Sequence, residues 1–345
     1  MKTYEEEIVY YYPEGHQDHY EYGHPERPER VERLRDALID AGWWEQYPKV
    51  QPHLVSDTVF NCIHSKSYLE SLNRLCQAGE RLDGDTYTTT TSWGLALKNC
   101  GGAIATALEV WDRKARRGFA LCRPPGHHAT RDWGMGFCLL NNIAFAAESI
   151  IQDRSANKLA IVDLDLHHGN GTQDIFWERG DVLYISTHQS PFYPGTGGLY
   201  ETGEGEGVGA TVNLPLPPGS GDIAFTTIMQ GIILPLLVRF DPQMILVSFG
   251  FDVHWRDPLG HLQLSAEGYG ELIKSLSKWA DEHCGGKIAL FLEGGYDLEA
   301  AAACGQAVTA AMLDISWHDP LGPSPRKEGT SWQIIYNRAK EIWGL

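Results

Sequence analysis

The sequence predicts an α/β fold, in which helices cover both faces of one central parallel sheet. Three observations lead to this prediction: short apolar runs alternate with helix-like segments, the runs are continuous, and no internal repeat or Pro/Ser-rich linker interrupts the pattern. Strands of a parallel sheet are buried on both faces, so they read as unbroken apolar runs. The chain has 345 residues, 43% of them hydrophobic, and we expect residues 1–345 to form a single domain.

Seven segments have the short, apolar composition that is typical of buried strands. In chain order they are residues 8–12, 118–122, 159–163, 182–187, 210–214, 244–249 and 287–292. Helical spacing of apolar residues predicts helices between them. These helices are expected after residues 24–30 as far as about 41, and at about 65–78, 92–114, 141–152, 222–239, 265–282, 298–313 and 330–342. Pro235 is expected to kink the helix at 222–239.

Charge and composition exclude several classes of protein. The net charge is −17 at pH 7, which argues against direct nucleic-acid binding and favours cationic partners or substrates. No run of about 18 apolar residues is present, so we expect no membrane span. Residues 1–7 are polar and acidic without the apolar stretch of a signal peptide, which predicts a cytoplasmic location. The seven cysteines form no Cys-x-x-Cys pair, as expected of buried, reduced thiols.

The third predicted strand ends in a cluster of ionisable side chains. Asp163, Asp165 and His167 occupy every second position at its end, so an extended backbone would aim all three to the same face. Two carboxylates and an imidazole on a buried face are costly unless something compensates them. A divalent metal such as zinc would do so, because carboxylate oxygen and imidazole nitrogen are standard ligands. The alternative is a hydrogen-bonded strand end followed by a polar turn at 169–171.

Polar side chains also follow three other predicted strands. The second, sixth and seventh strands lead to His127 and His128, to Asp252, and to Tyr296 respectively. Each has a simpler explanation, as a capped loop, a turn or an aromatic plug. Because ligands of parallel sheets bind beyond the carboxyl ends of the strands, four such coincidences predict a shared site.

These groups together specify hydrolysis of an amide or ester. Asp165, His167 and Asp252 would leave one position open for water, the arrangement of a catalytic rather than a structural zinc. Such a metal acidifies its water and polarises a carbonyl group. The paired histidines can then shuttle protons, and the tyrosine can donate a hydrogen bond to an oxyanion.

Six motifs resemble those of the zinc-dependent histone deacetylase family, which includes bacterial histone deacetylase-like amidohydrolases and acetylpolyamine amidohydrolases. They are Arg123-Pro-Pro-Gly-His-His128, Gly136-Phe-Cys138, Asp163-Leu-Asp-Leu-His-His-Gly-Asn-Gly171, Pro194-Gly-Thr-Gly197, Gly250-Phe-Asp252 and Glu293-Gly-Gly-Tyr296. They occur in the family's order, and the resemblance covers roughly residues 8–315. It implies the arginase/deacetylase fold, a single domain with a central parallel sheet of about eight strands flanked by helices.

The resemblance also implies roles for individual residues. The zinc ligands would be Asp165, His167 and Asp252, a set that also suits iron(II). The catalytic groups would be His127 paired with Asp163, His128 as general base and acid facing Asn170, and Tyr296 on the acyl carbonyl. A structural potassium ion would be held, mostly by main-chain carbonyls, at Asp163, Asp165, His167, Ser186 and Thr187. The tunnel for the lysine stem would be lined by Gly136, Phe137 and Tyr193, with Leu259 near its rim and Asp85 accepting from the substrate backbone.

Asn170 is typical of the class II branch of this family, whereas class I members usually carry Asp. An amide carries no charge, so it supports an imidazolium at His128 less than a carboxylate would. We therefore expect a lower pKa for His128 than in Asp-bearing relatives.

Several functions remain open at this point. The substrate is expected to be acetyl-lysine in a protein or peptide, but an acetylpolyamine is the alternative. Relatives specialised for polyamines carry an acidic residue at the tunnel rim, so Leu259 favours lysine, while the net charge of −17 leaves polyamines open. A catalytically inactive acyl-lysine binding module would show damage at Tyr296 or the metal ligands, which is absent here. A binuclear manganese hydrolase would need more carboxylates where His127 and His128 stand.

Overall fold

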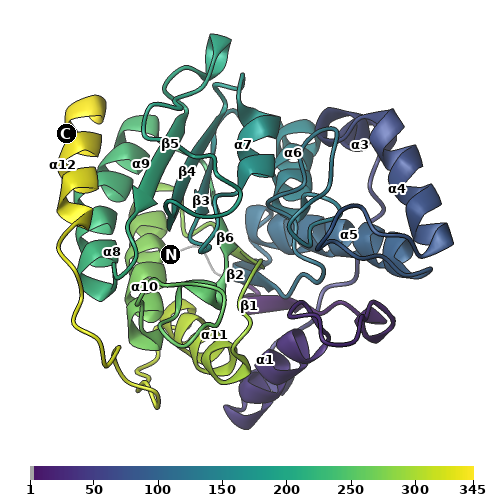
Figure 1. Ribbon diagram of the computed structural model, residues 1–345, viewed down its shortest axis with the longest axis horizontal. Coiled ribbons are helices and arrows are strands. Elements are labelled where there is room, and N and C mark those ends of the chain that lie inside the picture. Colours follow the sequence, from purple (N-terminus) through teal and green to yellow (C-terminus); the bar gives the residue numbers. More distant parts are fainter. Residues whose placement is uncertain (1–3) are drawn as a thin grey trace.

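One parallel sheet runs through the computed structural model, which describes residues 4–345 (Figure 1). Met1–Thr3, the start of the predicted polar terminus and of the predicted 1–345 domain, lie outside the described residues. The sheet has the strand order β1-β2-β7-β6-β3-β4-β5. Its strands are β1 Glu6–Tyr11, β2 Ala115–Ala120, β3 Leu159–Asp163, β4 Val182–Gln189, β5 Thr211–Leu216, β6 Ile245–Phe249 and β7 Ile288–Leu292. All seven segments predicted from their composition are strands.

The eighth strand implied by the family resemblance is not found within residues 4–345. A single bridge between Tyr10 and Lys49 lies on the outer side of β1 instead. There the Tyr10 N–H donates to the Pro48 carbonyl (3.0 Å), and the Val50 N–H donates to the Tyr10 carbonyl (2.8 Å). Prolines 48 and 52 have no N–H to donate, and they confine the pairing to this bridge.

Strand β2 begins three residues earlier than predicted, because two arginines belong to it. Arg117 is fully buried, and its guanidinium contacts both carboxylate oxygens of Asp281 at 2.9 Å. It also donates to the carbonyl of Gly286. A buried charge is tolerated when it is paired in this way, but the partner is distant in sequence, so composition alone suggests a loop.

Two layers of helices enclose the sheet (Figure 1). Their bounds are α1 Glu29–Asp40, α2 Trp43–Gln46, α3 Asp57–Ile63, α4 Lys66–Ala78, α5 Ser92–Trp111, α6 Asn142–Arg154, α7 Asn170–Phe176, α8 Asp222–Ile228, α9 Leu234–Phe240, α10 Ala266–His283, α11 Leu298–Met312 and α12 Trp332–Trp343. All the helices predicted from apolar spacing are present. The short helices α2, α3 and α7 were not predicted, since one or two turns carry too few residues to show a helical period.

Alternate side chains of each strand enter separate apolar cores on the two faces of the sheet. In β7, for example, Ile288 and Leu290 pack in the core under α1 and α8 to α12, whereas Ala289 and Phe291 pack in the core under α3 to α7. Burial on both faces explains why the strands read as continuous apolar runs.

Within the described residues, the helical segment Asp222–Phe240 bears on the expectation of no membrane span. By length and composition it could cross a membrane, with a mean hydropathy of 1.8 in a window that is 44% buried. Polar residues interrupt it, so a search for an unbroken apolar run misses it. In the structure Phe225 and Ile232 lie in the core. A π turn at Met229–Ile233 precedes Pro235, where a kink was predicted.

The strand order creates one crevice at the carboxyl edge of the sheet. Strands β3 and β6 are neighbours in the sheet, but the chain continues from them to opposite sides. After β3 it forms β4 on one side, and after β6 it forms β7 on the other. Open α/β sheets bind ligands at such a switch point. Asp163, the last residue of β3, pairs in register with Ser248 of β6, so the segments that follow both strands emerge together.

Candidate active site

The segment after β3 gathers the three ionisable side chains by a bend and not by the extended backbone that was predicted. Strand β3 stops at Asp163, and the next residues bend. The Asp165 N–H donates to Asp163 Oδ1 (3.2 Å), and the His167 N–H donates to Asp165 Oδ1 (2.8 Å). Aspartates favour such local turns because their side chains accept from the backbone two residues on. Asp165 and His167 still come together, whereas the Asp163 carboxylate contacts His127.

Asp252 joins Asp165 and His167 from the end of β6. One ligand atom from each of Asp165, His167 and Asp252 lies within 4.8 Å of the others. His167 Nδ1 lies 3.2 Å from Asp165 Oδ1 and 3.3 Å from Asp252 Oδ2. Both carboxylates are buried, and the imidazole is nearly so. The structure thus brings together the three predicted metal ligands from two strand ends.

The chemistry of this cluster fits a divalent metal ion. Asp252 Oδ2 is buried but accepts no hydrogen bond, which is costly for a carboxylate oxygen. Glycines leave the space around it open: a Cβ on Gly250 would lie 1.8 Å from Asp165 Oδ2, and one on Gly294 would lie 2.1 Å from Asp252 Oδ2. Two carboxylates and one imidazole suit zinc, and also iron(II).

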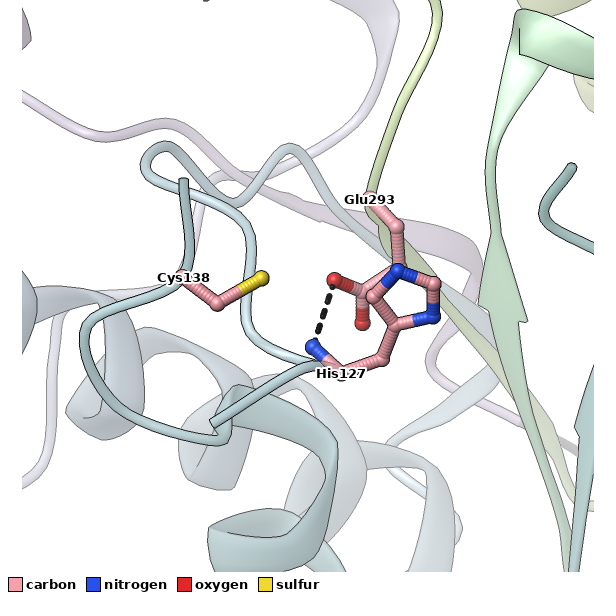
Figure 2. A group of neighbouring side chains, drawn as sticks. All are labelled: His127, Cys138 and Glu293. Atoms are coloured by element: carbon pink, nitrogen blue, oxygen red, sulfur yellow. Dashed lines mark hydrogen bonds between the residues drawn. The ribbon is translucent and has the colours of Figure 1, made fainter. Parts of the chain in front are cut away.

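A second group of possible ligands, His127, Cys138 and Glu293, lies nearby but is less suited to a metal (Figure 2). The Glu293 carboxylate is already occupied: it accepts from the N–H groups of Gly126 (2.7 Å) and His127 (3.1 Å) and from Ser248 Oγ (3.0 Å). Burial raises the pKa of the Cys138 thiol well above its usual value, which opposes the thiolate that a metal requires. This group therefore anchors the loop that carries His127.

His127 lies between two carboxylates. Its Nδ1 is 3.1 Å from Asp163 Oδ2, and its Nε2 is 3.7 Å from Asp165 Oδ1. Burial opposes the charged imidazole, but Asp165 and Asp163 outweigh it and raise the pKa of His127 to about 10. The Tyr184 hydroxyl also donates to Asp163 Oδ2 (3.1 Å). His127 is therefore a fixed positive charge at neutral pH in the protein without a bound cation.

His128, the next residue, is a neutral base. Burial, together with the neighbouring rings of His127 and His167, holds the pKa of His128 well below its usual range. Its Nδ1 lies 2.7 Å from Asn170 Oδ1. An amide oxygen only accepts hydrogen bonds, so Nδ1 carries the proton and Nε2 keeps its lone pair. Asn170, at the start of α7, thus sets the tautomer of His128.

A cavity of about 220 Å³ is lined by His127, His128 and His167. Its lining residues are Asp85, Pro125, His127, His128, Gly136, Phe137, His167, Phe192, Tyr193, Leu259, Gly294 and Tyr296. All five residues expected to bind substrate are among them. Phe192 was not predicted: its ring stacks on His167, with centroids 5.5 Å apart. Its only signal in the sequence is its position beside Tyr193 in an otherwise Gly-rich loop.

The cavity wall is strained at Phe137. This residue has φ of 70°, a left-handed conformation that is uncommon for a side chain with a Cβ. Its N–H donates to Thr86 Oγ1 (3.2 Å), and its ring meets that of Tyr296 edge-on at 5.8 Å. Gly136, also left-handed, leaves no room for a side chain, since a Cβ would lie 2.5 Å from His128 Cδ2. This part of the cavity wall therefore lies in close contact with His128 and Tyr296.

Tyr296 is held by two residues that the sequence did not identify. Asp257 Oδ2 accepts from the Tyr296 N–H at 2.6 Å, and the Arg30 guanidinium lies 4.8 Å from the centre of the phenol ring. Burial raises the pKa of Tyr296 well above its usual value, so the hydroxyl keeps its proton as a donor. Neither Arg30 nor Asp257 is near Tyr296 in the sequence.

The residues expected to hold potassium lie together around the carboxyl end of β3, with Ser186 and Thr187 on the neighbouring strand β4. Asp163 pairs in register with Ser186. The Thr187 hydroxyl donates to the main-chain carbonyl of Asp163 (3.4 Å). Asp165 and His167 follow directly in the bend after β3.

Residues 24–312 match the family described as the histone deacetylase domain. A probable deacetylase of Archaeoglobus fulgidus is 41% identical over 280 residues, covering 81% of this chain and 78% of that protein. A histone deacetylase-like amidohydrolase of Pseudomonas aeruginosa is 38% identical over 303 residues, covering 87% and 80%. Among solved structures, the HDA15 HD domain has a TM-score of 0.89 and 32% identity, covering 98% of this chain and 94% of that one.

Zinc should stabilise the protein through Asp252. With free zinc at about 100 times its Kd, we expect about 2.7 kcal/mol of added stability, seen as a higher Tm by calorimetry. Asp252→Asn keeps the shape of the side chain but removes the charge of the oxygen that accepts no hydrogen bond, so most of this rise should disappear.

Asp153→Asn is the matched control, because this aspartate is exposed on α6 and belongs to neither group of possible metal ligands. It should respond to zinc like the unaltered protein. An equal rise in Tm for the Asp252→Asn variant would contradict this assignment of the metal ligands.

Proposed function

The chain belongs to the histone deacetylase family and is a hydrolase of that family, and from this premise we propose that it hydrolyses the amide of Nε-acetyl-lysine in proteins or peptides. The observation that carries this proposal is the joint lining of one narrow cavity by a neutral histidine base, a protonated tyrosine and a residue of the metal-binding cluster. A cavity of about 220 Å³ suits an extended lysine stem with a small acyl group.

The family is metal-dependent, generally with zinc, and in this proposal Asp165, His167 and Asp252 hold one zinc ion per chain. Iron(II) suits the same donors. When bound, the cation acidifies water and polarises the acyl carbonyl. The buried Asp252 Oδ2, which accepts no hydrogen bond, supports this assignment, since a cation would satisfy it.

His128 is the general base and then the general acid. Its Nε2, left with a lone pair by the hydrogen bond from Nδ1 to Asn170, accepts a proton from the attacking water. The same proton then passes to the lysine amine as the amide bond breaks. The low pKa of His128 keeps it neutral before the reaction and ready to give up the proton afterwards.

Tyr296 and His127 stabilise the negative charge that develops on the acyl oxygen. The Tyr296 hydroxyl stays protonated and donates a hydrogen bond to the oxyanion, and the Arg30 guanidinium over its ring favours that donation. His127, held between Asp163 and Asp165, is in ring contact with His128 at 4.1 Å. In the protein without a bound cation, its positive charge lowers the pKa of His128.

A structural potassium ion is a further part of the proposal. Its ligands would come mostly from main-chain carbonyls of Asp163, Asp165, His167, Ser186 and Thr187. The paired ends of β3 and β4 support this, because parallel strands in register bring Asp163 and Ser186 side by side. A cation there would offset the charge of the buried Asp163 carboxylate.

Acetylpolyamine is the second candidate substrate, and a specific observation keeps it in view. Asp85 lines the cavity and is exposed at its mouth, where it could meet a second amine. Leu259 lies on the same cavity and presents no charge. We propose lysine because the apolar Leu259 favours a peptide over a second cation.

The substrate preference can be measured side by side. The unaltered protein should turn over an acetyl-lysine peptide with a higher kcat/KM than acetylspermidine. Leu259→Glu should shift that ratio toward acetylspermidine by up to about fivefold, because an exposed ion pair contributes at most about 1 kcal/mol.

Leu259→Gln is the control, since it has the size of the Glu variant without its charge. It should leave the ratio between the two substrates almost unchanged. If the unaltered protein has a higher kcat/KM for acetylspermidine than for the acetyl-lysine peptide, the proposed preference for lysine is wrong.

The uncharged partner of His128 has a consequence for pH dependence. Asn170→Asp would place a carboxylate 2.7 Å from Nδ1 and favour the imidazolium, so the pKa of His128 should rise. Because the base must be neutral, the acidic limb of the profile of kcat/KM against pH should move to higher pH, by about one unit or more.

Asn157→Asp makes the same change of charge on the surface, beyond the site, and should leave the acidic limb in place. If the acidic limb of kcat/KM against pH also stays unchanged in the Asn170→Asp variant, the pKa of this limb does not belong to His128.

A further inference from the structure

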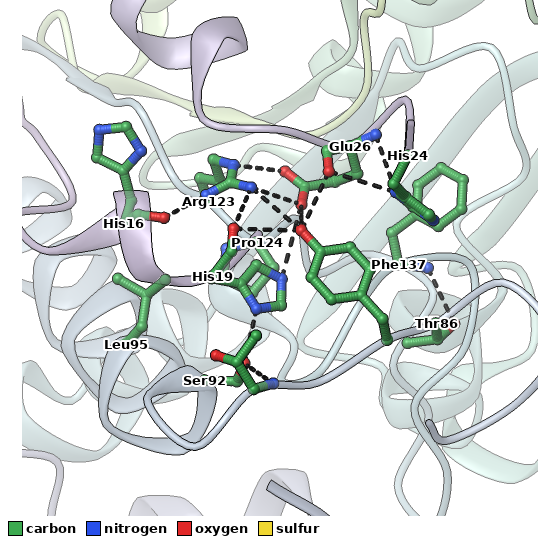
Figure 3. Close-up of polar contacts among 12 residues, drawn as sticks. His16, His19, His24, Glu26, Thr86, Ser92, Leu95, Arg123, Pro124 and Phe137 are labelled. Carbon is green, nitrogen blue, oxygen red and sulfur yellow. Dashed lines mark hydrogen bonds and ion pairs between the residues drawn. The ribbon is translucent and has the colours of Figure 1, made fainter. Parts of the chain in front are cut away.

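A buried carboxylate in the charged motif at residues 24–30 has no part in the mechanism described so far. Glu26 is fully buried and lines no part of the cavity, yet it sits at the centre of a polar network (Figure 3). Its partners include two buried arginines, Arg123 and Arg30, which lead to different catalytic segments.

The first arm of the network leads to the histidine pair. Arg123 Nη2 donates to Glu26 Oε2 (3.1 Å), and Arg123 Nε lies 2.8 Å from Oε1. The remaining donors of Arg123 reach the carbonyls of His16 (2.5 Å) and His19 (2.6 Å), as Figure 3 shows. Arg123 opens the short loop that ends in His128, so its position fixes the start of that loop.

The second arm leads to the tyrosine. Arg30 Nη1 lies 3.3 Å from Glu26 Oε1. Arg30 Nε donates to the Gly295 carbonyl (2.7 Å), and Nη2 donates to the Glu293 carbonyl. The same guanidinium stacks on the ring of Tyr296. Arg30 therefore binds the backbone at residues 293 and 295 and also contacts the ring of Tyr296.

The negative charge of Glu26 binds both arginines. Burial opposes ionisation, but Arg123, His19 and Arg30 outweigh it and lower the pKa of Glu26 to about 2. Two buried guanidiniums repel each other and need an anion between them, because an unpaired buried charge is strongly destabilising. In the described residues, Glu26 is the carboxylate that contacts both arginines.

We propose that Glu26 is a positioning residue of the deacylation reaction, which fixes the distance between the His128 loop and the Tyr296 segment through Arg123 and Arg30. This inference rests on the proposed function. The general base and the oxyanion donor act on the same acyl group, and a misplacement of about 1 Å can cost about 100-fold in rate. The carboxylate touches neither substrate nor metal ligand and acts through its two arginines.

A double-mutant cycle tests this. Glu26→Gln keeps the shape of the side chain, but its amide nitrogen cannot accept, so one guanidinium loses its partner. We expect kcat to fall about tenfold or more with KM changed less than about twofold, because Tyr296 is misplaced in the transition state. In a Tyr296→Phe background, the same substitution should cost less than about threefold, since one of the two groups whose separation Glu26 fixes is gone.

The assays use a trifluoroacetyl-lysine peptide, whose activated carbonyl keeps the slow Tyr296→Phe variants measurable. Tyr87→Phe is the control for the loss of a single hydroxyl: the group donates to the same carboxylate (3.1 Å) and accepts from Arg123 Nη2 (3.2 Å), but its removal keeps the Glu26 charge and both arginines. It should keep kcat within about twofold of the unaltered protein. If Glu26→Gln does not fold, Glu26→Asp, which keeps the charge on a shorter arm, takes its place in the cycle.

An equal loss of kcat in the Tyr and Phe backgrounds would show a general structural role and overturn this inference while leaving the proposed function intact. An unchanged kcat in the Glu26 variant would do the same. Absence of turnover by the unaltered protein would overturn the proposed function, and this inference with it.

Discussion

The confinement of Asp165 and Asp252 within one buried pocket is the constraint on which the rest of the site depends. Both carboxylates are removed from water, and one oxygen of Asp252 accepts no hydrogen bond. In the protein without a cation, His167 compensates this negative charge. Burial opposes protonation of its ring, but its contacts with both carboxylates raise the pKa of His167 to about 9. A divalent cation can take over that role, and the transition metals that suit these donors also have the chemistry for amide hydrolysis.

The surroundings are built to keep this pocket open and to face it with the right groups. Gly250 and Gly294 stand where any side chain would collide with the carboxylates. The crevice between β3 and β6 exists because the chain leaves these adjacent strands in opposite directions. The proposed base, His128, and the proposed oxyanion donor, Tyr296, come from two further loops, one after β2 and one after β7, and the buried arginines that contact Glu26 also contact residues of these segments. The catalytic geometry thus depends on tertiary contacts as much as on strand ends.

Much of the fold could be predicted from the sequence, since strands buried on both faces leave continuous apolar runs. The failures have physical causes. The start of β2 was missed because Arg117 is neutralised by a distant Asp281, and α7 was missed because it is too short to show a period. The candidate site residues could be found because they follow strands directly and form motifs. Phe192, Asp257, Arg30 and Glu26 could not, because their roles arise only when distant segments meet.

Anomalous diffraction from crystals of the zinc-loaded protein, recorded on both sides of the zinc absorption edge, tests the central claim most directly. The account predicts one strong peak at about 2 Å from ligand atoms of Asp165, His167 and Asp252, the usual bond length for these donors. A peak held instead by His127, Cys138 and Glu293, or a zinc-loaded crystal with no peak between the two carboxylates, would contradict it.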